Sequence, residues 1–151
     1  MLAGPDGRVA AHGLWFHGRS SASLRPWVDL VAPDLSVLGA VAATLGPGAS
    51  LMVAYDADDT ERALRRKAPA AATPIGSALL AAGCRWFKDW YFAEGGREGG
   101  TKLQGTVPLD DEHRIRAESV LAHQLRAFLM RPGIDDIDRR AATNALSIVA
   151  P

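Results

Sequence analysis

A dense run of aromatic and charged side chains in the middle of the chain is the first segment that could carry chemistry. Half of the aromatic residues fall between positions 86 and 92, interleaved with Lys88 and Asp89. If residues 84–92 form a strand, alternate side chains point to opposite faces, and each charge lies among aromatic rings. Ionisable groups in an apolar setting have shifted pKa values, which makes them catalytic candidates. The candidates are the catalytic residues Lys88, Asp89 and Tyr91 and the substrate-binding residues Trp86 and Trp90.

The alternative for this segment is purely structural. A strand at a sheet edge lets Lys88 and Asp89 reach water, while the aromatic side chains belong to an ordinary core. Structural ion pairs also perturb pKa values, so the pattern alone leaves both interpretations open.

A glycine-rich loop follows this segment and could hold an anion. Residues 94–102 contain four glycines together with two cationic side chains. Glycine lets the backbone approach a ligand closely, and backbone N–H groups with nearby cations hold negative charge. This predicts substrate contacts from Gly96, Arg97, Gly99 and Lys102, with a plain hairpin connection as the alternative.

The helix start at residues 73–77 is a third candidate. Thr73 followed by Pro74 is typical of an N-cap with Pro at the first helical position. The free N–H groups of a helix start carry partial positive charge and suit phosphate. We therefore expect Thr73, Gly76 and Ser77 to bind an anionic cofactor, with an acyl-coenzyme A as the candidate. The alternative is a capped core helix in which Gly76 permits close packing.

Acidic clusters, histidines and the lone cysteine give weaker signals. Asp56, Asp58 and Asp59 follow an expected strand and could hold Mg²⁺, although helix capping explains them equally well. The four histidines lack metal-ligand spacing, so no metal site is predicted. Cys84 is expected to be a small buried residue rather than a nucleophile.

Hydrophobic periodicity and turn signals predict the elements that must position these residues. Strands are expected at 13–17, 24–31, 50–55, 84–92 and 101–107, and helices at 33–45, 60–67, 73–82, 110–130 and 135–149. Pro26 would force the second strand to a sheet edge or into a bulge. His113 and His123 are expected to be ordinary surface or boundary residues of the long helix.

The alternation of strands and helices predicts an α/β fold, with α+β as the alternative. We expect one layered domain over residues 1–151, with a mixed sheet of about five strands, helices packed on it and two C-terminal helices. Residues 1–12 are rich in Gly, Ala and Pro and are expected to be loose.

Length and composition exclude several classes of protein. A chain of 151 residues with 48% apolar and 23% charged residues is typical of one globular domain. Lys plus Arg equals Asp plus Glu at 17 each, whereas nucleic-acid binders carry a basic excess. A single cysteine excludes an internal disulfide, and no apolar run reaches the roughly 18 residues of a membrane span. We expect a soluble cytoplasmic protein that binds neither nucleic acid nor membranes.

Two unusual pieces of sequence carry a resemblance. Trp-Phe-Lys-Asp-Trp-Tyr-Phe at 86–92 and Gly-Gly-Thr-Lys-Leu-Gln-Gly at 99–105 resemble an uncharacterised prokaryotic family of unknown function. The likeness covers residues 50–115 and implies membership without a reaction.

A second, weaker resemblance concerns the fold. Ile-Gly-Ser-Ala-Leu-Leu-Ala-Ala at 75–82 resembles the helix opening of the GCN5-related N-acetyltransferases, whose Gly-rich turn holds the coenzyme A pyrophosphate. Only Gly76 and the apolar positions after it match that pattern. The resemblance implies an N-acetyltransferase-like fold.

Two functions are therefore expected as alternatives. The first is a small-molecule acyltransferase-like enzyme, or a degenerate relative, with its cofactor at 73–77. The second is a non-catalytic assembly or binding module, in which the aromatic strand and the C-terminal helices bury against another copy to form a homodimer. A concave pocket around Lys88 and Asp89 would favour the enzyme, and a flat apolar patch would favour the module.

Overall fold

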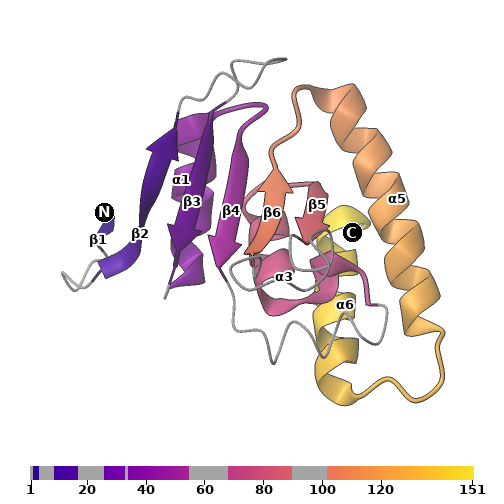
Figure 1. Ribbon diagram of the computed structural model, residues 1–151. Helices are drawn as coiled ribbons and strands as arrows, with labels where there is room; N and C mark the ends of the chain where they lie inside the picture. Colours follow the sequence, from indigo (N-terminus) through magenta and orange to yellow (C-terminus); the bar gives the residue numbers. More distant parts are fainter. Residues whose placement is uncertain (1, 4–8, 17–25, 33, 55–67, 90–101) are drawn as a thin grey trace.

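A mixed sheet organises the part of the chain that the computed structural model describes, residues 2–3, 9–16, 26–32, 34–54, 68–89 and 102–151 (Figure 1). Its six strands lie in the order β1-β2-β3-β4-β6-β5. The strands are β1 (Leu2–Ala3), β2 (Val9–Phe16), β3 (Trp27–Val31), β4 (Ser50–Ala54), β5 (Trp86–Asp89) and β6 (Lys102–Thr106). The helical elements are η1 (Leu35–Val37), α1 (Leu38–Leu45), η2 (Ala70–Ala72), α3 (Pro74–Ala81), α5 (Asp111–Leu129) and α6 (Asp136–Val149).

The parallel pair β3–β4 lies inside the sheet, and the other described strand pairs are antiparallel. Parallel neighbours need a crossover connection, which η1 and α1 supply. Asp34 starts this crossover by accepting the N–H of Ser36 at 3.0 Å, and Gly46 ends it with φ 82°. The expected mixed α/β class is confirmed, as are the helix that ends at Gly46 and the buried strand β4.

The N-terminal part of the sheet differs from expectation. Residues 1–12 were expected to be loose, but Leu2–Ala3 and Val9–Phe16 are strands, which brings the described sheet to six strands rather than about five. The physical reason is pairing: β2 lies antiparallel to β3 from His12 to Phe16, so its backbone groups find partners despite weak local propensity. The expected edge position around Pro26 is also wrong, because Pro26 precedes β3, which lies between β2 and β4.

Alternate side chains of β3, β4 and β6 point into a core that α1 and α3 cover. Its fully buried strand members are Val28, Leu30, Leu51, Val53 and Leu103. They pack with Leu38 and Val41 of α1 and with Leu79 of α3. Gly105 of β6 lets α3 approach, because a Cβ at Gly105 would lie 3.3 Å from the Leu79 Cβ.

The two C-terminal helices were expected and are confirmed. They form an antiparallel hairpin beside the β5 edge of the sheet (Figure 1). Asp110 and Asp135 cap them by accepting the N–H groups of His113 at 2.9 Å and Asp138 at 3.0 Å. Their shared core contains Leu125, Phe128 and Ala142, and Leu80 of α3 packs into it. The adjacent residues Leu79 and Leu80 therefore belong to two different cores.

Charged residues occur along the whole of α5, the longest described helix at 19 residues. Within the described ranges, no helix combines the length and the apolar character needed to cross a membrane.

Candidate functional site

β5 is one of the two edge strands of the described sheet, and this position determines the surroundings of the aromatic segment. Burial alternates along it, with Trp86 39% exposed, Lys88 exposed, and Phe87 and Asp89 partly buried. The expectation that Lys88 lies in an apolar interior is wrong, because the edge strand leaves its side chain in contact with water. The structural alternative for this segment is the better description of Lys88.

Several sequence candidates cannot be placed in this geometry. They lie outside the described residues, as do the expected helix at 60–67 and the possible magnesium ligands. These candidates are Trp90, Tyr91, Gly96, Arg97, Gly99, Asp56, Asp58 and Asp59.

Lys102, expected to help the glycine loop hold an anion, has a structural partner within the sheet. It opens β6, and its Nζ donates a hydrogen bond to Oδ2 of Asp29 on β3. Both side chains are about one-third exposed and reach across the intervening strand β4. Its positive charge is therefore already partly neutralised by a carboxylate.

At the start of α3, the two N–H groups expected to bind a cofactor already have acceptors within the protein. The N–H of Gly76 donates to Oγ1 of Thr73 at 3.1 Å, and the N–H of Ser77 donates to the Thr73 carbonyl at 2.7 Å. Space is also lacking, because a Cβ on Gly76 would lie 1.8 Å from the carbonyl oxygen of Ala70. Gly76 and Ser77 therefore lack the free N–H groups on which the expected anion site at Thr73, Gly76 and Ser77 depends. This geometry favours the alternative, a capped core helix.

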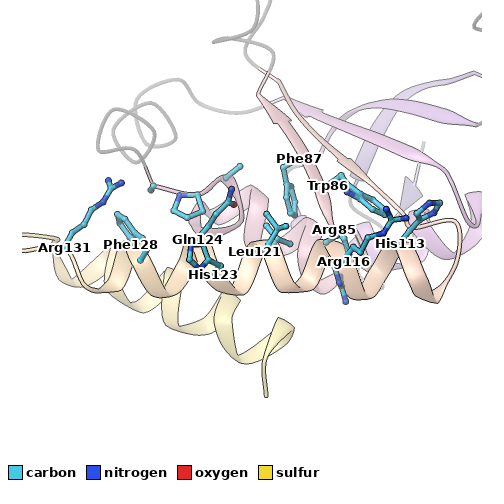
Figure 2. A pocket seen from close by; sticks show the side chains of 16 residues that line it. Arg85, Trp86, Phe87, His113, Arg116, Leu121, His123, Gln124, Phe128 and Arg131 are labelled. Carbon is cyan, nitrogen blue, oxygen red and sulfur yellow. The ribbon is translucent and has the colours of Figure 1, made fainter.

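A cavity of about 940 Å³ lies between α5 and the segment formed by η2 and β5. We call it the edge cavity, because it borders the edge strand β5. Side chains from both faces of that strand line it. Its apolar part includes Phe87 of β5 and Leu121 and Phe128 of α5. Figure 2 shows the lining side chains from His113 near the start of α5 to Arg131 just beyond its end.

Positive charge distinguishes the lining of the edge cavity. Among the described lining residues, the groups that carry or can take up positive charge are Arg85, Arg116, Arg131, His113 and His123, and there is no Asp or Glu. Carboxylates do contact three of these groups, Glu118 at Arg85, Glu112 at Arg116 and Asp110 at His113, but none of the three carboxylates lines the cavity. A lining with cationic groups and no carboxylate of its own favours anions over cations.

Arg85 is the most firmly held of these groups. Its Nε donates to Oε1 of Glu118 at 3.1 Å, and its Nη1 donates to the carbonyl oxygens of Leu80 at 2.9 Å and Cys84 at 3.0 Å. Glu118 in turn accepts from Nη1 of Arg114 at 2.9 Å, and this hydrogen bond raises the pKa of Arg114. The network joins the edge strand to α5 and fixes the wall of the cavity.

Trp86 forms the neighbouring part of the wall. Its ring meets the His113 ring edge-on, with centroids 5.8 Å apart and an interplanar angle of 77°. Trp86 was predicted to bind substrate, and the structure places it at a cavity. His113 was expected to be an ordinary surface or boundary residue of the helix, and it lines the same cavity. Arg85, which precedes Trp86 in the sequence, also lines this end of the cavity.

The sequence interpretation missed the contribution of α5. Its lining positions 113, 117, 120, 124 and 127 follow steps of three and four residues, which place them on one side of the helix, and positions 116, 121, 123 and 128 flank that row. That spacing was readable in the sequence. Nothing in the sequence showed, however, that this side of α5 faces an edge strand rather than water.

Neither a metal centre nor a reactive thiol is visible in what the structure describes. No group of three or more His, Cys, Asp or Glu side chains is placed to hold a metal ion within the described ranges. Cys84 is fully buried, and burial raises the pKa of its thiol to about 12. A buried neutral thiol is a poor nucleophile, in agreement with the structural role expected for Cys84.

Comparisons with known proteins extend the resemblance seen in the sequence. A crystal structure of a protein of unknown function, AQ1966 from Aquifex aeolicus VF5, is similar with a TM-score of 0.68 and 23% identity. The match covers 88% of this chain and 72% of the other, and at this identity it supports the fold alone. No match to a curated protein was found. The GCN5-related resemblance is not supported by these comparisons.

The family assignment rests on a wider match than the two sequence pieces quoted above. The model of a family described as "Protein of unknown function (DUF1122)" matches residues 6–132, which include the whole sheet from β2 onward and all of α5. The expected membership of an uncharacterised family is thereby confirmed, and the chain belongs to the DUF1122 family.

Proposed function

We propose that this protein binds a small organic anion in the edge cavity. The observation that carries the proposal is the lining: three arginines and two histidines, with no carboxylate in the described wall, around an apolar floor. A ligand with a negative group and an apolar body complements both parts of that lining.

The size of the edge cavity supports a ligand rather than a packing defect. Small-molecule sites span about 300–1,000 Å³, and the cavity of about 940 Å³ lies near the upper limit. Defects left by imperfect packing are far smaller, since protein interiors are close-packed.

The charge network beside the cavity supports an anion. Glu118 contacts two arginines, Arg85 at 3.1 Å and Arg114 at 2.9 Å. Glu118 divides its negative charge between two guanidinium groups and therefore neutralises Arg85 only in part, while Arg114 also contacts Asp111 at 3.5 Å. The remaining positive charge of Arg85 lies next to the cavity. Both Arg85 and Glu118 are mostly shielded from water, with 12% and 18% of their side chains exposed, so this charge is screened less than a surface charge.

Binding in the edge cavity does not by itself imply a reaction. Lys88 and Asp89, the described catalytic candidates, are not among the described residues that line the edge cavity. An acyl-coenzyme A is itself an organic anion with an apolar part, so it belongs in any panel of test ligands.

The test is a thermal-shift screen with matched anionic and neutral ligands. Carboxylates, phosphate esters and acyl-coenzyme A compounds are compared with the corresponding alcohols and amides. Binding to the folded state raises the melting temperature. We expect anionic members to raise it and their neutral counterparts to raise it less.

Two variants connect any shift to the edge cavity. Ala127→Phe places a ring in the cavity, whereas Ser119→Phe places the same ring at an exposed position of α5 that does not line it. We expect ligand shifts to disappear in Ala127→Phe and to persist in Ser119→Phe. Equal shifts in both variants, or no preference for anions in the wild type, would show that the proposed function is wrong.

The alternative of an assembly module stays a prediction. Two large apolar side chains on α5 are more than half exposed, Ile115 at 58% and Val120 at 56%. Five residues apart on a helix, they point in directions that differ by about 140°, so they do not form one flat patch.

A further inference from the structure

We infer that Nη2 of Arg85 is the atom that binds the anionic group of the ligand, and that the apolar part of the ligand lies against Trp86 and Phe87. This inference rests on the proposed function, because it names the recognition element within the edge cavity. The anionic groups that fit are carboxylate, sulfonate and phosphate, which share the same acceptor chemistry.

The hydrogen bonds of Arg85 leave one nitrogen unused. A guanidinium has five N–H groups, one on Nε and two on each Nη. Nε donates to Glu118, and both hydrogens of Nη1 have acceptors in the carbonyl oxygens of Leu80 and Cys84. Among the residues that the structure describes, Nη2 has no hydrogen-bond partner, so two N–H groups remain.

The unused nitrogen must contact open space. Among the described residues, no side-chain nitrogen or oxygen that is buried from solvent lacks a hydrogen-bond partner. Nη2 has no partner and is therefore accessible. Because Arg85 lines the edge cavity and only 12% of its side chain is exposed, the cavity is the space that Nη2 contacts.

The other contacts of Arg85 hold this nitrogen in a fixed direction. Leu80 and Cys84 flank the turn that connects α3 to β5, and Glu118 comes from α5 on the opposite wall. A ligand that binds a prearranged donor loses less conformational entropy than one that must order a mobile side chain. Arg116 differs, since its side chain is 65% exposed and its ion pair with Glu112 is long at 3.7 Å.

The neighbours of Arg85 supply the apolar contact. Trp86 and Phe87 follow it in sequence, point to opposite faces of β5, and both line the edge cavity because β5 is the edge strand. Figure 2 shows both rings above α5, with Phe87 on the side of Leu121. A ligand whose negative group contacts Arg85 therefore has aromatic surface beside it.

The experiment uses two fluorescent probes with nearly the same apolar body. Anilinonaphthalene sulfonate carries a negative group, and N-phenylnaphthylamine lacks it. The measured quantity is the ratio of their affinities for the intact protein. A hydrogen bond to a charged group corresponds to about a tenfold or larger preference for the sulfonate in the wild type.

Three variants assign that preference to an atom. Arg85→Met removes the donor, and Arg85→Met/Glu118→Met also removes the carboxylate, which would otherwise lose one of its two arginine partners. Arg116→Met is the matched control, because it removes an equal charge from the same cavity. We expect the preference to vanish in both Arg85 variants and to stay within about threefold of the wild type in Arg116→Met. Circular dichroism confirms folding, and the double variant decides the result if the single variant unfolds.

The outcomes separate this inference from the proposed function. Suppose that the wild type prefers the sulfonate, that Ala127→Phe abolishes this preference, and that the Arg85 variants keep it. The Arg85 inference then fails while the proposed function stands. An equal loss in Arg116→Met also overturns the inference, since it would assign the preference to net charge alone. If the wild type shows no preference, both fail. If the wild type does prefer the sulfonate, competition with hydrocinnamate and with phenyl phosphate distinguishes carboxylate from phosphate ligands.

Discussion

Gly105 of β6 lies directly against Cys84, which ends the turn between α3 and β5. A Cβ at Gly105 would lie 2.8 Å from the Cβ and 3.1 Å from the Sγ of Cys84. This contact sets how closely α3 approaches the sheet, and both residues are buried. The position therefore admits no side chain without displacing the helix that carries Leu79 and Leu80.

Gly105→Ala is expected to destabilise the protein by about 1–3 kcal/mol, because the added methyl group overpacks a buried contact. Gly39→Ala is the matched control, since nothing lies within 4 Å of a Cβ at that exposed position of α1. It is expected to stabilise by about 0.5–1 kcal/mol, as Ala replaces Gly inside a helix. Urea unfolding measures both, and equal effects would contradict the close approach.

Thr73→Ala is expected to cost about 1–3 kcal/mol, because it removes the N-cap of α3 and leaves the buried N–H of Gly76 without its acceptor. Thr73→Ser keeps the hydroxyl that donates to the Ala70 carbonyl at 2.7 Å and should lose less than half as much. Chemical unfolding of the two variants checks this. Equal losses would mean that the methyl group, and not the cap, matters.

Stability should fall at alkaline pH through Cys84. Burial raises the pKa of its thiol to about 12 from an ordinary value of 9.0. The folded protein keeps the thiol neutral while the unfolded chain ionises it, so this contribution is complete below pH 9.0 and is lost as pH rises towards 12. We expect the difference in unfolding free energy between wild type and Cys84→Ala to shrink above pH 9.0. A difference that stays constant with pH would contradict the buried thiol.

The ion pair between Arg85 and Glu118 should be stronger than the one between Arg116 and Glu112. The first pair is mostly shielded from water and has a nitrogen–oxygen distance of 3.1 Å. The second pair is exposed and has a nitrogen–oxygen distance of 3.7 Å. A double-mutant cycle on the exposed pair is expected to give a coupling below about 0.5 kcal/mol. The cycle on Arg85 and Glu118 should exceed that value, and a smaller coupling would mean that the network does not fix the wall of the edge cavity.

Local signals made much of the fold predictable. Asp34, Thr73, Asp110 and Asp135 are caps that a sequence pattern shows directly, and each starts the helix expected from it. The strand β2 was harder to predict, because its stability comes from pairing with β3 rather than from its own composition. The strand after Pro26 was wrongly expected at a sheet edge for the same reason, because its position depends on which strands pair with β3.

The candidate site was predictable only in part. The sequence singled out Trp86, which lines the edge cavity, and also Lys88, which does not. Arg85 received no role in the sequence interpretation, since its placement depends on Glu118, 33 residues away. Contacts between elements so distant in sequence have no local signature, and only the packing of α5 beside β5 reveals them.

The division of α3 between two cores has a consequence for how the molecule opens. Leu79 belongs to the core under the sheet and the next residue, Leu80, to the core between α5 and α6. Neither core can lose its packing without exposing a leucine of the helix that also completes the other. Backbone amides in β4 and in α6 should therefore exchange with solvent through a common opening rather than as separate foldons, and a ligand held by α5 would slow exchange in the sheet as well.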